Sequence, residues 1–114
     1  MNNEQLLVNI HLVVDRLMNL GGADYDSDKA ASPEDKSKGL IARDFGIEEW
    51  DWPQGVGLYG LLKLQNFYGD GRYLDFLKNW YDSNLKKGLP SRNINTTAPY
   101  LTLAYLLDVL DNPE

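Results

Sequence analysis

The feature that most limits the fold is an alternation between two kinds of apolar segment. In the segments at about 6–17 and 72–87, apolar residues recur at steps of three and four, which places them on one stripe of an α-helix. The segments at about 53–68 and 98–110 are apolar almost all round, which is typical of helices buried on most sides. This alternation predicts an all-α chain of about four main helices in two hairpins, with an outer and an inner layer. The two stripes consist of Leu6, Leu7, Ile10, Val13, Val14 and Leu17, and of Tyr73, Leu74, Leu77, Trp80, Tyr81 and Leu85.

A repeated three-residue pattern sets the register of the two hairpins. Asp51-Trp52-Pro53 and Thr97-Ala98-Pro99 each combine a capping side chain, a spacer and a proline suited to the first turn of a helix, and they lie 46 residues apart. This spacing is within the range of about 40–47 residues found in helical-hairpin repeats. We therefore expect residues 1–114 to form a single unit in which both polar turns line one cavity. A further helix would begin just after residue 114, so we also expect an apolar side that other hairpins would cover.

Residues 21–45 differ in composition from both kinds of helix. Asp, Ser, Lys, Ala and Gly dominate this stretch, which has no hydrophobic periodicity and few large apolar groups, so we predict a mobile surface loop. Asp24, Asp26 and Asp28 alternate as at the start of an EF-hand calcium loop. However, Lys29 stands where that loop needs glycine, and no glutamate follows at the twelfth position. The sequence therefore predicts no metal site.

The charge and the cysteine count exclude several classes of function. With 11 basic and 17 acidic side chains the net charge is -6, which disfavours binding to nucleic acid or to an anionic membrane surface. The absence of cysteine excludes disulfides, thiolate metal sites and cysteine nucleophiles. No apolar run is long enough to span a membrane, and the start lacks the features of a signal peptide. We therefore expect a cytoplasmic protein.

Two long motifs carry a resemblance to a known family. The first is the stretch 50–61, Trp-Asp-Trp-Pro-Gln-Gly-Val-Gly-Leu-Tyr-Gly-Leu, and the second is the stretch 93–99, Asn-Ile-Asn-Thr-Thr-Ala-Pro. Between them the likeness continues through 73–76, 80–81 and 88–90. The chain resembles the N-terminal portion of the unsaturated rhamnogalacturonyl hydrolases, glycoside hydrolase family 105. The resemblance implies an (α/α)6 toroid with a substrate pocket at the mouth of its inner ring.

The same resemblance implies a reaction. Members of the family remove the 4,5-unsaturated uronic acid from rhamnogalacturonan fragments during pectin degradation, by hydration of its vinyl ether and without a cofactor. The proton donor is an aspartate in a Trp-Asp-Asp-Thr-like motif of a later hairpin, and these 114 residues contain no such motif. We therefore expect the chain to bind part of an unsaturated galacturonyl oligosaccharide and to be inactive alone. The alternatives are a carbohydrate-binding module without chemistry, or a helical module that associates through its exposed inner faces.

The turn before the first apolar helix supplies three candidate residues. Trp50 and Trp52 could stack on a sugar ring or could fill the core, and Trp52 is the preferred sugar contact. Asp51 could accept hydrogen bonds from sugar hydroxyls or act as an auxiliary carboxylate, although its position favours an N-cap. No residue of this chain is expected to be the catalytic acid.

The turn before the second apolar helix supplies four more candidates. Asn93, Asn95 and Thr96 carry amides and a hydroxyl that suit sugar oxygens, but the same groups commonly make local turn bonds. Arg92 could pair with the uronate carboxylate, or could be an ordinary surface arginine. The helix that follows adds partial positive charge at its N-terminus, which favours an anionic sugar.

Overall fold

The computed structural model describes residues 1–21 and 46–109. These residues form four α-helices, and no strand occurs among them. The helices are α1 (Asn3–Met18), α3 (Trp52–Tyr68), α4 (Leu74–Lys87) and α5 (Ala98–Val109). The all-α prediction is thus confirmed, whereas the loop predicted at 21–45 lies outside the described residues except for Gly21.

The helix boundaries follow from local capping. The side chain of Asn2 accepts a hydrogen bond from the backbone N–H of Gln5 at 2.8 Å and so caps α1. α3 has Asp51 at its N-cap and a proline in its first turn, and it ends at Gly69, whose φ of 67° suits glycine. Gln65 connects α3 to α4, because its side-chain oxygen accepts the backbone N–H of Tyr73 at 2.7 Å.

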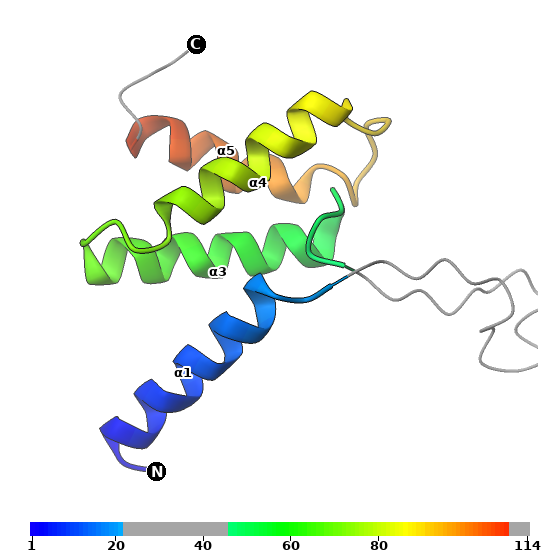
Figure 1. Cartoon of the computed structure of the whole chain (residues 1–114). Coiled ribbons are helices and arrows are strands. Elements are labelled where there is room, and N and C mark those ends of the chain that lie inside the picture. Colours follow the sequence, from blue (N-terminus) through cyan, green and yellow to red (C-terminus); the bar gives the residue numbers. More distant parts are fainter. Residues whose placement is uncertain (22–45, 110–114) are drawn as a thin grey trace, which may run out of the picture.

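The two helices predicted to form the inner layer, α3 and α5, pack against each other. They run in the same direction, while α1 and α4 run the opposite way (Figure 1). The main core lies between α3, α4 and α5. Its buried hydrophobic members are Leu58, Leu61, Leu62, Tyr73, Leu77, Trp80, Tyr81 and Leu106, joined by Trp50 and by Val14 of α1.

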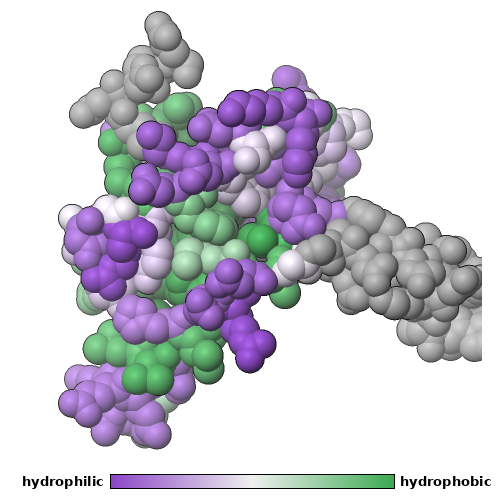
Figure 2. Space-filling view, in the orientation of Figure 1, coloured by the Kyte–Doolittle hydropathy of each residue, from purple (hydrophilic) through white to green (hydrophobic). Residues whose placement is uncertain are grey.

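Large apolar surfaces remain uncovered on two helices. On α1, Leu6, Leu7 and Val13 belong to the predicted stripe and are nevertheless exposed, and hydrophobic side chains gather on this helix in Figure 2. On α5, Leu101 and Tyr105 are about half exposed. The expectation of an uncovered apolar side is therefore confirmed for the described residues. None of their helices combines the length and the apolar character needed to cross a membrane.

One predicted core position on α4 is wrong. The sequence pattern places Leu85 on the buried stripe, but its side chain is 48% exposed, whereas Asn84 is buried. Asn84 lies about two helical turns after Leu77 and therefore on the same side of the helix. Its side-chain amide donates to the carbonyl of Trp80 at 3.0 Å, which offsets the cost of burying a polar group.

Candidate functional site

The turns that precede α3 and α5 lie side by side at one end of the helices (Figure 1). The indole Nε1–H of Trp50 donates a buried hydrogen bond of 2.8 Å to the carbonyl of Thr96. These two residues are 46 positions apart and therefore occupy equivalent places in the two hairpins. The two polar turns therefore lie together, as the 46-residue spacing predicts.

Trp50 occupies the core. Its side chain is only 7% exposed and stacks on Trp80 with ring centroids 5.4 Å apart. Tyr81 and Tyr100 meet it edge-on at 5.7 and 5.0 Å. Of the two interpretations that the sequence left open for Trp50, the structure favours core packing, so this residue offers little surface to a sugar.

Asp51 and Trp52 have different environments although they are adjacent. Asp51 is buried at the N-cap position of α3, and its carboxylate accepts the backbone N–H of Trp52, the first residue of the helix, at 2.8 Å. Trp52 is 50% exposed at the start of α3. The aromatic surface available for stacking at this turn therefore belongs to Trp52.

The second turn is organised by its own side chains. The side-chain oxygen of Asn93 accepts the backbone N–H groups of Asn95 at 2.9 Å and Thr96 at 3.1 Å. The Thr96 hydroxyl accepts the N–H of Asn93 and donates to the carbonyl of Ser91, both at 2.9 Å. These bonds fix the turn without any ligand.

The groups that remain available at the second turn include several hydrogen-bond donors. Arg92, Asn93 and Asn95 are exposed, and among the described residues no hydrogen bond or ion pair engages the guanidinium of Arg92 or the amide nitrogens of the two asparagines. Such donors match a carboxylate or sugar hydroxyls. Within the described part of the chain, no group of three His, Asp or Glu side chains could hold a metal ion.

Two residues that support the site were not singled out from the sequence as site residues. Tyr81 donates its hydroxyl to the carbonyl of Pro99 at 2.7 Å and so connects α4 to the start of α5. Burial raises the pKa of the Tyr81 hydroxyl above its usual range. Gln54 donates its amide to the carbonyl of Gly46 at 2.6 Å and holds the segment that leads into α3.

Glu49, just before Trp50, makes the stability of the folded chain depend on pH. Burial, and then repulsion from Asp51, raise its pKa above the ordinary value of 4.5. The folded chain therefore holds this proton more tightly than the unfolded chain, so the free energy of unfolding falls as the pH rises from near 4.5 through the raised value. Glu49→Gln removes this titration. We expect the variant to lose less stability than the native chain between mildly acidic and neutral pH.

Urea unfolding at the two pH values measures this difference. Glu48→Gln is the matched control, because it removes the same charge from an exposed neighbour. An equal change of the pH slope in both variants would show that net charge, and not the burial of Glu49, causes the effect.

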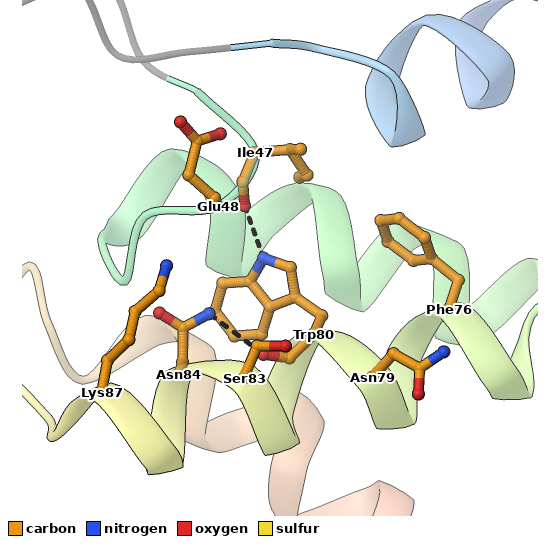
Figure 3. Close-up of a pocket in the computed structure, with 8 residues that line it drawn as sticks. All are labelled: Ile47, Glu48, Phe76, Asn79, Trp80, Ser83, Asn84 and Lys87. Atoms are coloured by element: carbon orange, nitrogen blue, oxygen red, sulfur yellow. Dashed lines mark hydrogen bonds between the residues drawn. The ribbon is translucent and has the colours of Figure 1, made fainter.

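A separate pocket lies on the other side of Trp80. It has a volume of about 230 Å³ between α4 and the segment before α3 (Figure 3). Trp80 donates its indole N–H to the carbonyl of Ile47, and Phe76, Ser83 and Lys87 are among the other lining residues (Figure 3). This pocket contains none of the seven candidate sugar-contacting residues.

Comparison with known proteins decides the family. The model of Glycosyl Hydrolase Family 88 matches residues 31–114. The chain belongs to this family. The match includes α3, α4, the described part of α5 and both candidate turns.

Individual relatives agree with this assignment. The chain is 34% identical over 83 residues to the unsaturated rhamnogalacturonyl hydrolase YesR of Bacillus subtilis, an alignment that covers 72% of this chain. Two crystal structures, each described as a possible member of glycoside hydrolase family 105, are 28% identical to it. The one from Salmonella enterica superposes with a TM-score of 0.74 over 99% of this chain, and the one from Klebsiella pneumoniae with 0.73 over 98%. The resemblance to family 105 and the toroid-type helical arrangement are thus confirmed.

The relatives are much longer than this chain. It spans 23% of the length of YesR, and 29% and 28% of the two crystallised proteins. The chain therefore corresponds to about a quarter of the length of these relatives.

Proposed function

We propose that this chain forms part of the pocket wall of a toroidal glycoside hydrolase that removes a 4,5-unsaturated uronic acid from rhamnogalacturonan fragments. The observation that carries the proposal is the pairing of the two polar turns through Trp50 and Thr96, beside a half-exposed Trp52. The family match and the identity to an unsaturated rhamnogalacturonyl hydrolase support it.

The two turns offer complementary contacts to an anionic sugar. Trp52 provides an aromatic face for the apolar side of a sugar ring. Asn93, Asn95 and Arg92 provide donors for hydroxyl and carboxylate oxygens. The N-termini of α3 and α5 lie at the same end, so both helix dipoles favour negative charge there. A uronic acid combines the ring face and the carboxylate that these groups suit.

The chemistry requires a group that this part of the toroid does not provide. A carboxylic acid adds a proton to C4 of the unsaturated sugar, and water adds to C5 with loss of its own proton. The resulting hemiketal opens to a ketone at C5 and leaves a hemiacetal at C1. Collapse of this hemiacetal to an aldehyde breaks the glycosidic bond and releases the next sugar with a free hydroxyl. Asp51 uses its carboxylate to cap α3, which leaves it at most an auxiliary role. We infer that the acid belongs to a hairpin outside these 114 residues.

The exposed apolar faces of α1 and α5 favour a second, compatible function as an assembly module. In a toroid each hairpin buries its sides against its neighbours. Half-exposed Leu101 and Tyr105 on α5 suit such a neighbour better than water. A second copy of this chain could cover the same faces. Sedimentation of the sample used for the sugar titration therefore shows whether the chain is a monomer or self-associated.

A titration with an unsaturated galacturonyl disaccharide tests the proposal. We expect the tryptophan fluorescence of the chain to change at millimolar sugar, and Trp52→Ala to weaken binding by about tenfold or more, equivalent to roughly 1.4 kcal/mol. Phe67→Ala is the matched control, because Phe67 is an exposed aromatic residue near the other end of α3.

Loss of the ultraviolet absorbance of the sugar double bond measures turnover in the same samples. We expect no turnover by this chain. Turnover would contradict the inference that the acid lies elsewhere, and an unchanged fluorescence signal would contradict the sugar-binding role.

A further inference from the structure

A buried donor connects the two candidate turns. Trp50 belongs to the segment before α3, and its indole N–H reaches across to the carbonyl of Thr96, in the turn before α5, at 2.8 Å. The bond is enclosed, since Trp50 is 7% and Thr96 8% exposed. In such surroundings water replaces a lost partner poorly, so the bond constrains the relative position of the two turns.

Thr96 is also the residue on which the local bonds of the second turn converge. Its backbone N–H and its hydroxyl engage Asn93, and the hydroxyl also donates to the carbonyl of Ser91. These bonds give the turn its shape but do not connect it to α3. The bond to Trp50 makes that connection, because it holds the residue around which the turn is built.

The indole that makes this bond is itself fixed. Trp80 stacks on one face of it, and Tyr81 and Tyr100 contact it edge-on. Trp52 follows two positions later as the first residue of α3. A fixed indole therefore sets the distance between the exposed ring of Trp52 and the donors of Asn93 and Asn95.

We propose that Trp50 is a positioning residue, whose indole N–H holds the 93–97 turn in register with Trp52 so that one sugar can contact both. The consequence for sugar binding rests on the proposed function. The consequence for the turn does not, because the bond exists without a ligand.

Replacement of Trp50 by β-(benzothiophen-3-yl)alanine tests the role of the N–H alone. This analogue keeps the shape of the two rings and substitutes sulfur for the N–H group. The same replacement at Trp80 is the matched control. Trp80 is equally buried, belongs to the same aromatic cluster and also donates to a backbone carbonyl, but its acceptor is Ile47 and not the second turn.

Two measurements then separate positioning from general stability. We expect amide hydrogen exchange at Asn95 and Thr96 to accelerate about tenfold with the Trp50 analogue and to stay unchanged with the Trp80 analogue. We expect the dissociation constant for the unsaturated disaccharide, followed by NMR, to rise about tenfold only with the Trp50 analogue.

The possible failures are distinguishable. Equal exchange rates and equal affinities in both analogues would overturn the positioning role while leaving the proposed function intact. Absence of sugar binding by the native chain, together with faster exchange in the Trp50 analogue, would overturn the proposed function and retain Trp50 as the connection between the turns.

Discussion

Gly55→Ala is expected to destabilise the chain by about 1–3 kcal/mol, because it places a methyl group where α3 lies against the start of α5. A Cβ at this position would lie 2.7 Å from the backbone carbon of Ala98 and the backbone nitrogen of Pro99. These are backbone atoms at the start of a helix and cannot rotate away. The gain of about 0.5–1 kcal/mol from replacing a helical glycine offsets only part of the cost.

Gly60→Ala is the matched control for this prediction. It lies in the same helix, but no heavy atom comes within 4 Å of an added Cβ. Only the gain in helix propensity applies there, so we expect a stabilisation of about 0.5–1 kcal/mol. Urea unfolding of both variants measures the difference. Equal stabilities would show that α3 and α5 are not in close contact in solution.

The ends of α3 and the location of the two turns could be predicted from the sequence, whereas the contact at Gly55 could not. Asp51, Pro53 and Gly69 are local signals that act within one turn, and they placed the ends of α3 to within about a residue. The 46-residue register then placed both turns at one end. Contact between two helices depends on the shapes of side chains from both segments. The sequence alone does not indicate which of the glycines of α3 lies against another helix.

The candidate site was predictable as a location but not residue by residue. Trp50 and Trp52 are of the same type and lie two positions apart, in a turn where helical periodicity does not apply. The sequence therefore could not decide that Trp50 is buried and Trp52 half exposed. Trp50 is buried because its ring packs against Trp80, Tyr81 and Tyr100. These three residues belong to helices that are distant from Trp50 along the chain. Sequence reasoning likewise missed the hydroxyl of Tyr81 as a donor to Pro99.

Leu77→Ala is expected to cost about 3 kcal/mol, since Leu77 is completely buried and its truncation leaves a cavity between α3, α4 and α5. For a small unit with uncovered apolar faces, this is a large share of the total stability.

Leu85→Ala is the matched control on the same helix. Leu85 lies roughly 80° around the helix from Leu77 and is 48% exposed, so we expect a cost below about 1 kcal/mol. Urea unfolding compares the two variants. Equal destabilisation by the two substitutions would show that α4 is rotated about its axis in solution. Trp80 and Tyr81, the two residues of this helix that pack against Trp50, would then be displaced with it.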